Sequence, residues 1–149
     1  MPNILHRVTI DAPPKHVHEL VATREGIALW WTGRPVGGED SVGGRLSVYF
    51  GNATNPAATF EVVERSAEQV VWQCVAGPSD WIDTRVTFAL GSRADGGTTL
   101  LFSHEGWRVE NEFMNGCSTN WGSYLTSLKA GAEGGKFNAF PGGEISRWD

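Results

Sequence analysis

The sequence has few of the features that would place it in several large protein classes. Its 149 residues contain two cysteines, and charged residues make up only 19% of the chain. Cys74 and Cys117 lie far apart and outside any CxxC motif, which favours two buried free thiols over a disulfide framework. No apolar run approaches the ~18 residues of a membrane-spanning helix, so we expect no membrane span. The net charge of −5 argues against a nucleic-acid partner, because phosphate backbones attract basic surfaces.

The usual signatures of metal and nucleotide chemistry are also missing. The sequence contains no HExxH, GxSxG, Walker A or GxGxxG motif. His16 and His18 would point in different directions from a helix, so they cannot share a metal ion. We therefore predict no metal site, no cofactor and no catalytic residues. The first residues lack the apolar segment of a secretory signal, which favours the cytoplasm.

Tryptophan and glycine are abundant in this chain. It contains seven Trp, seven Phe and 19 Gly, and hydrophobic residues make up 40% of it. Tryptophan brings a large apolar surface with one polar group, and glycine indicates many turns. The length suits one domain over residues 1–149, with a core at about 4–135 and a tail at 136–149. The tail carries Phe137, Phe140 and Trp148, so we expect part of it to pack onto the core.

Alternation of apolar and polar residues predicts six strands. A period of two residues is typical of a strand with one buried face. The turns between consecutive segments are short, which indicates antiparallel neighbours, since parallel strands need a long crossover. The predicted strands are Ile4–Ile10, Arg45–Phe50, Ala58–Glu64, Gln69–Val75, Asp83–Leu90 and Thr98–Glu105.

Helical spacing predicts two short helices near the start and one long helix near the end. The short ones cover Pro14–Ala22 and Arg24–Leu29, and the long one covers Asn111–Ala132, with Trp121 and Leu128 in its apolar stripe. The expected order is one strand, two short helices, five strands and a long helix. This order is typical of the α+β class, in which a curved antiparallel sheet wraps around the helix.

Five short motifs occur in a characteristic order along the chain. They are Asp11-Ala12-Pro13-Pro14, Trp30-Trp31, Gly43-Gly44-Arg45-Leu46, His104-Glu105-Gly106-Trp107 and Asn120-Trp121. This ordered set resembles the activator of heat-shock-protein-90 ATPase homologue-like family, which belongs to the START-like (SRPBCC, Bet v 1-like) superfamily. The resemblance extends from about Ile4 to Gly135. It implies a helix-grip fold, with a six-stranded sheet around the last helix and a cavity between them.

The resemblance also implies a function. Many members of the superfamily bind an apolar or aromatic small molecule, so we expect a non-catalytic carrier, sensor or sequestering protein for such a molecule. One alternative is a cyclase or aromatase that acts on a polyketide-type substrate. Another is a co-chaperone-like module that binds a protein partner, which would need an exposed apolar patch such as Phe137, Phe140 and Trp148. A homodimer is plausible on the same resemblance.

Aromatic residues on loops and on inward strand faces are the candidates for ligand contact. His104 follows Leu100 and Phe102 on the inward face of the last predicted strand. It is expected either as a hydrogen-bonded core residue or as a group at the cavity mouth that orients a ligand. Aromatic residues on loops are typical of a pocket rim. The predicted ligand contacts are Trp31, Trp72, Trp81, Phe88, Phe102, His104, Trp107, Met114, Trp121 and Leu125.

A few polar side chains could orient a ligand inside such a cavity. The candidates are His104, Tyr49, Arg85 and Asn120. Strand alternation places Tyr49 opposite Val48 and Arg85 opposite Val86, so both should face outward unless a bulge shifts the register. Because Trp30 and Trp31 are consecutive, we expect only one of them to point inward. Whether the aromatic side chains leave a cavity or fill it is not determined by the sequence.

Overall fold

A seven-stranded antiparallel sheet packs against one long helix. The structure is a computed structural model that describes residues 1–149. The strands are β1 (Ile4–Ile10), β2 (Gly37–Gly38), β3 (Arg45–Val48), β4 (Ala58–Arg65), β5 (Gln69–Ala76), β6 (Arg85–Ser92) and β7 (Thr98–Glu105). Their order in the sheet is β1-β7-β6-β5-β4-β3-β2, and every neighbouring pair is antiparallel. This α+β arrangement is the helix-grip fold predicted from the sequence.

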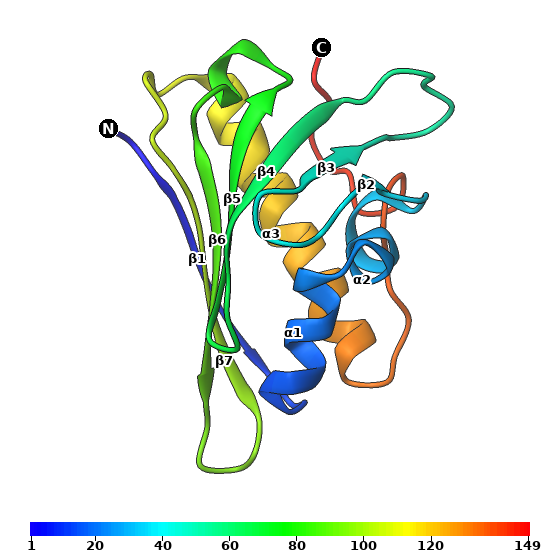
Figure 1. The fold of residues 1–149 in the computed structure, drawn as a ribbon, viewed down its shortest axis with the longest axis vertical. Coiled ribbons are helices and arrows are strands. Elements are labelled where there is room, and N and C mark those ends of the chain that lie inside the picture. The colour runs from blue at the N-terminus through cyan, green and yellow to red at the C-terminus, as the bar shows by residue number, and fades with distance from the viewer.

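Helices α1 (Pro14–Ala22), α2 (Arg24–Ile27) and α3 (Glu112–Ala132) lie together on one side of the sheet (Figure 1). The π-helical turn η1 (Ala28–Thr32) follows α2, and the 3-10 turn η2 (Ser79–Trp81) connects β5 to β6. The Asn111 side chain caps α3 by accepting a hydrogen bond from the Met114 amide at 2.9 Å. Thr23 caps α2 in the same way, through the Gly26 amide at 3.0 Å.

Most predicted elements are confirmed, the bounds of β3 to β6 shift by one or two residues, and two predictions are wrong. The bounds of α1, β1 and β7 are those expected from the sequence. The sheet has seven strands rather than six, because Gly37 and Gly38 pair with Ser47 and Leu46. A strand of two glycines has no side chains and therefore no alternation. The second short helix ends at Ile27 instead of continuing to Leu29, because the chain widens there into η1.

Both residues of the Trp30-Trp31 pair are buried, which corrects the expectation that only one points inward. Their rings stack at 6.1 Å with an angle of 16° between the planes. The expectation assumed a regular element, in which consecutive side chains diverge, whereas η1 is a π-helical turn. Trp30 Nε1 donates to the Leu20 carbonyl at 2.8 Å, which places Trp30 against α1. Trp31 faces α3 and packs against Trp121, with 4.9 Å between the ring centroids.

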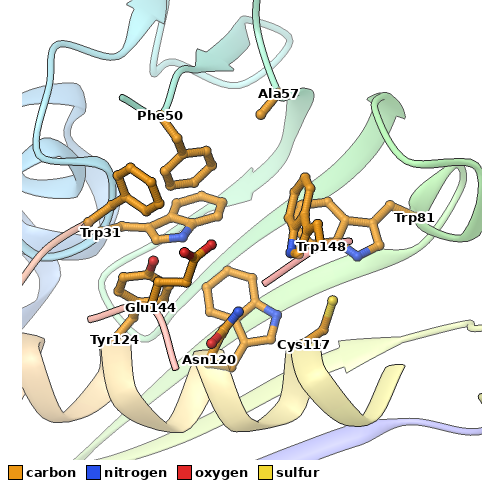
Figure 2. Close-up of a pocket in the computed structure, with 11 residues that line it drawn as sticks. Trp31, Phe50, Ala57, Trp81, Cys117, Asn120, Tyr124, Glu144 and Trp148 are labelled. Carbon is orange, nitrogen blue, oxygen red and sulfur yellow. The ribbon is translucent and has the colours of Figure 1, made fainter. Parts of the chain in front are cut away.

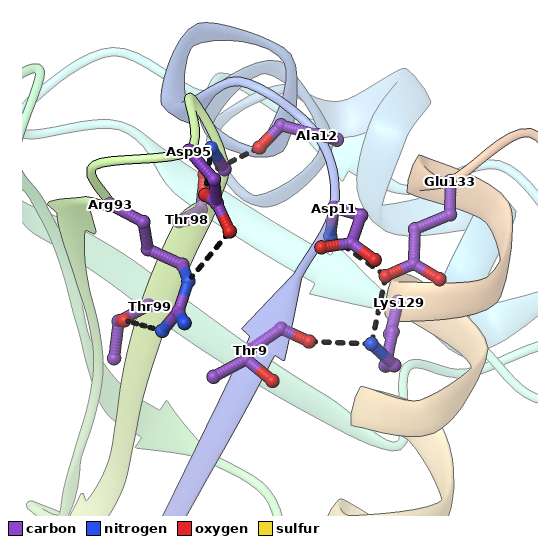
Figure 3. Close-up of polar contacts among 10 residues, drawn as sticks. Thr9, Asp11, Ala12, Arg93, Asp95, Thr98, Thr99, Lys129 and Glu133 are labelled. Atoms are coloured by element: carbon purple, nitrogen blue, oxygen red, sulfur yellow. Dashed lines mark hydrogen bonds and ion pairs between the residues drawn. The ribbon is translucent and has the colours of Figure 1, made fainter.

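A polar cluster fixes the end of α3 against the edge strand β1 (Figure 3). Lys129 Nζ donates to the Thr9 carbonyl at 2.6 Å and to Glu133 Oε2 at 2.8 Å. The same Glu133 oxygen accepts the backbone N–H of Asp11 at 2.8 Å. The hydrogen bond from Asp11 and the neighbouring Lys129 lower the pKa of Glu133, so this carboxylate is ionised at neutral pH. These contacts set the distance between the helix and the sheet.

Candidate functional site

A cavity of about 210 Å³ lies between η1, α3, the η2 turn and the C-terminal tail (Figure 2). Nine of its eleven lining residues are hydrophobic. Its size exceeds that of a ~150 Å³ apolar cavity that stays dry and binds benzene. The lining residues are Trp31, Phe50, Ala57, Trp81, Cys117, Asn120, Trp121, Tyr124, Phe140, Glu144 and Trp148.

One face of α3 supplies the floor of the cavity. Cys117, Asn120, Trp121 and Tyr124 recur at intervals of three and four residues, which brings them onto one face of a helix. Figure 2 shows the side chains of Cys117, Asn120 and Tyr124 rising from α3 toward Trp31 and the tail. The helical period of the sequence thus produces this wall directly.

The C-terminal tail forms the opposite wall. Phe140, Glu144 and Trp148 all line the cavity, and the Phe140 amide donates to the Trp31 carbonyl at 2.9 Å. Farther along, Asn120 Oδ1 accepts the amides of Ile145 at 2.8 Å and Ser146 at 2.9 Å. Its Nδ2 donates to the Ser146 carbonyl at 2.7 Å. The buried side chain of Asn120 therefore holds the tail over the cavity. This agrees with the expectation that part of the tail packs onto the core.

Replacing Asn120 by Ala is expected to release the end of the tail. The change removes three hydrogen bonds, and at a net ~0.5–1.5 kcal/mol each we expect a loss of about 2 kcal/mol in unfolding free energy. Limited proteolysis should cut after Arg147 faster in Asn120→Ala than in wild type. Thr119→Ala, on the exposed face of α3, is the matched control. Equal cleavage rates in wild type and Asn120→Ala would contradict this role.

His104 lies behind the cavity wall, not at its mouth. It is fully buried, and its two ring nitrogens both have partners. Trp121 Nε1 donates to His104 Nδ1 at 3.1 Å, so the proton of a neutral imidazole resides on Nε2, which donates to Thr84 Oγ1 at 2.8 Å. Thr84 Oγ1 in turn donates to the Trp81 carbonyl at 2.5 Å. His104 thus connects two cavity-lining residues, Trp121 and Trp81, without facing the cavity.

Burial keeps three ionisable groups near the cavity, His104, Cys117 and Tyr124, in their neutral forms. It lowers the pKa of His104 from 6.5 to about 3 and raises the pKa of the Cys117 thiol to about 12. Burial, together with the nearby Glu144, raises the pKa of Tyr124 as well. Both Cys117 and Cys74 are buried and free, as predicted. The cavity therefore offers no thiolate and no imidazole base at neutral pH.

Three of the predicted ligand contacts line the cavity, namely Trp31, Trp81 and Trp121. The other predicted contacts are buried but lie outside the lining. These residues are Trp72, Phe88, Phe102, His104, Trp107, Met114 and Leu125. Trp31 and α3 cover those on the inner face of the sheet, and Trp107, Met114 and Leu125 pack into the core. In particular, Trp107 is fully buried against His104 and Phe113 and does not form a rim. As ligand contacts, all ten remain predictions.

The polar side chains proposed to orient a ligand also divide into one that lines the cavity and others that do not. Asn120 lines the cavity, whereas Arg85 is exposed and donates to Gln73 Oε1 at 3.2 Å. Tyr49 is half-buried, and the Arg34 guanidinium lies 5.0 Å from its ring centroid. Alternation had placed Tyr49 and Arg85 away from the cavity, and neither lines it.

Sequence reasoning missed several lining residues on α3, on the tail and on the β3–β4 connection. They include Phe50, Ala57, Tyr124, Phe140, Glu144 and Trp148. Tyr124 could have been found, since it lies one helical turn beyond Asn120 in the apolar stripe of α3. No local pattern marks the others, because they reach the cavity through loop conformation.

Among the helices, none has the length and apolar character needed to cross a membrane.

Comparisons with known proteins agree with this architecture. Residues 11–133 match the family model described as activator of Hsp90 ATPase homolog 1-like protein. The solution structure of the Aha1 dimer from Colwellia psychrerythraea is 31% identical, with a TM-score of 0.79, and the alignment covers 91% of this chain and 99% of that one. No curated protein matches the chain.

More distant structures share the fold. CalU16 from Micromonospora echinospora is 18% identical with a TM-score of 0.77, over 99% of this chain and 74% of that one. PFC0360w from Plasmodium falciparum, described as an HSP90 activator, is 15% identical with a TM-score of 0.69, over 85% and 92% of the two chains. The family match over most of the chain and the 31% identity to the Colwellia protein show that this chain belongs to the activator of Hsp90 ATPase homolog 1-like family, within the START-like superfamily.

Proposed function

We propose that this protein binds a small hydrophobic or aromatic molecule in the cavity between η1, α3 and the tail. The observation that carries this proposal is the cavity itself, with about 210 Å³ of space and mainly aromatic walls. Burial of apolar ligand surface contributes ~25 cal/mol per Å² before the cost of immobilising the ligand. Pockets for drug-sized molecules measure ~300–1,000 Å³, so the ligand of this smaller cavity is a molecule of one or two rings.

A non-catalytic role suits the chemistry of the cavity wall. A general acid or base needs to reach the substrate with a pKa near the working pH. His104 is enclosed behind Trp121, with both nitrogens hydrogen-bonded and a pKa of about 3. Cys117 and Tyr124 line the cavity in their neutral forms, and Glu144, the one lining carboxyl group, has no Lys, Arg or His beside it in the lining. These observations favour a carrier, sensor or sequestering protein over a cyclase or aromatase.

Native mass spectrometry of protein purified gently from its own host tests the proposal. We expect a non-covalent mass excess of one to two hundred daltons that disappears under denaturing conditions. Titration with indane, an apolar bicyclic hydrocarbon, should also give saturable heat in calorimetry. Trp148→Arg, which would place a charged side chain at the cavity wall, should weaken indane binding. The absence of both a mass excess and saturable indane binding would contradict the proposal.

Self-association is a second proposed property. It is supported by the Colwellia relative, whose structure is described as a dimer and which covers nearly the whole chain. Phe137 and Phe140, which the sequence offered as an exposed patch for a protein partner, pack against the core instead. Light scattering coupled to size-exclusion chromatography measures the mass directly. A mass of one chain at micromolar concentration would contradict a stable dimer.

A further inference from the structure

We propose that the indole N–H of Trp81 is the hydrogen-bond donor that selects the ligand of this cavity. The preferred ligand is then a planar aromatic molecule that carries an uncharged oxygen acceptor, such as a ring carbonyl. This inference rests on the proposed function, since it names the ligand class of the same cavity. Three observations support it: the Trp81 N–H lacks a strong acceptor, its ring is held in a fixed position, and the cavity wall carries no positive charge.

Trp81 presents an unpaired polar atom in an apolar wall. Its side chain is 2% exposed, and its Nε1 has no hydrogen-bond partner in the chain other than a weak contact with the Cys117 thiol. The indole nitrogens of two other buried tryptophans are paired, Trp121 with His104 and Trp30 with the Leu20 carbonyl. A buried donor without a partner is rare in folded proteins and costs free energy. An acceptor atom on a ligand would recover that free energy.

The surroundings of Trp81 hold its ring in place. The Trp81 amide donates to the Pro78 carbonyl at 2.9 Å, and its carbonyl accepts the Thr84 amide at 2.9 Å and the Thr84 hydroxyl. The ring packs edge-on against His104, with 5.3 Å between centroids. A donor held in this way loses little conformational entropy when a ligand binds.

The Trp81 nitrogen is directed toward Cys117 on α3 (Figure 2). Both residues line the cavity. A neutral thiol is only a weak acceptor, and the pKa of Cys117, raised to about 12 by burial, keeps it neutral. A carbonyl oxygen is a much stronger acceptor. It would therefore compete well for the space between the indole and the thiol.

Trp148 packs against Trp81 at the cavity wall and is held there by ring contacts alone. Its ring packs edge-on against Trp81 at 5.2 Å, and the side chain is 42% exposed. The last residue of the chain with a hydrogen bond is Ser146, so only ring contacts hold Trp148. A small displacement of this ring admits an oxygen atom to the Trp81 N–H.

The charge of the lining selects against anionic acceptors. None of the lining residues is Lys, Arg or His, and Glu144 places a carboxylate at the wall. A carboxylate or phenolate ligand would be buried without a counter-charge, which is costly. An uncharged carbonyl has no such penalty. The acceptor that fits both Trp81 and Glu144 is therefore neutral.

The test compares indane with 1-indanone, which share a carbon skeleton and differ by one carbonyl group. Calorimetry should show that wild type binds 1-indanone about tenfold more tightly than indane, in line with the free energy of one satisfied buried donor. In NMR spectra the Trp81 Nε1–H resonance should move downfield with 1-indanone and not with indane. Trp81→Phe should bind both compounds with equal affinity, because it keeps an aromatic ring and loses the donor.

Trp107→Phe is the matched control. Trp107 is also buried and its Nε1 is also unpaired, but it lies outside the cavity lining. This variant should keep the tenfold preference for 1-indanone. Equal binding of the two compounds by wild type would overturn the role of Trp81 while leaving the binding function intact. Binding of neither compound would overturn the proposed function and this inference with it. The wild-type comparison decides the matter even if Trp81→Phe fails to fold.

Discussion

Lowering the pH from 7 to 4 is expected to cost the protein about 3 kcal/mol of unfolding free energy through His104 alone. Burial lowers the pKa of His104 from 6.5 to about 3 in the folded state. Between these two values the unfolded chain binds a proton that the folded chain does not. The contribution of His104 is therefore complete above pH 6.5 and is lost as the pH falls toward 3.

The matched variant for this prediction is His104→Gln. A glutamine amide can accept from Trp121 and donate to Thr84, as the neutral imidazole does, but it does not titrate in this range. Urea denaturation at pH 7 and pH 4 gives the free energy of unfolding of each protein. The difference between the two pH values should be about 3 kcal/mol larger for wild type than for the variant. Equal pH dependence would show that His104 becomes protonated in the folded state.

His104 also shows which features of a residue the sequence can predict and which it cannot. Alternation with Leu100 and Phe102 placed it on the inward face of β7, and the structure confirms that position. Its two hydrogen bonds could not be derived, because Thr84 and Trp121 approach from other elements. Local periodicity determines which way a side chain points. What it meets there depends on the packing of elements that are distant in the sequence.

The same distinction explains the rest of the fold. The strands and α3 have strong periods of 2 and 3.6 residues, so the sequence predicted them well. The glycine strand β2 and the π-helical turn η1 have neither period. The turn η1 is decisive for the site, because it buries Trp31 between the sheet and α3.

The location of the cavity depends on how the large side chains pack in three dimensions, which the sequence does not show. The ten predicted contacts lie along the inner face of the sheet, on nearby loops and on the long helix. In the structure Trp31 and Trp121 cover much of that face, and the open space lies on the other side of Trp31, beneath the tail. Phe140 and Trp148 belong to the site because two contacts anchor the tail, the hydrogen bond from the Phe140 amide to the Trp31 carbonyl and those of Asn120 with Ile145 and Ser146. Such an anchor cannot be recognised from helical spacing alone.

Replacing Trp31 by Ala is expected to destabilise the protein by about 3–5 kcal/mol, the usual effect of truncating a large buried aromatic residue. The Trp31 ring stacks on Trp72 at 6.0 Å and packs on Trp121 at 4.9 Å, so its removal leaves a void between the sheet and α3. Trp148→Ala is the matched control, since Trp148 lines the same cavity but is 42% exposed and lies at the end of the chain. Urea denaturation followed by far-UV circular dichroism compares the two variants without relying on tryptophan emission. We expect Trp148→Ala to lose less than about 1.5 kcal/mol, because its ring is only half removed from water. Similar losses for the two variants would mean that Trp31 is not the residue that joins the cavity wall to the core.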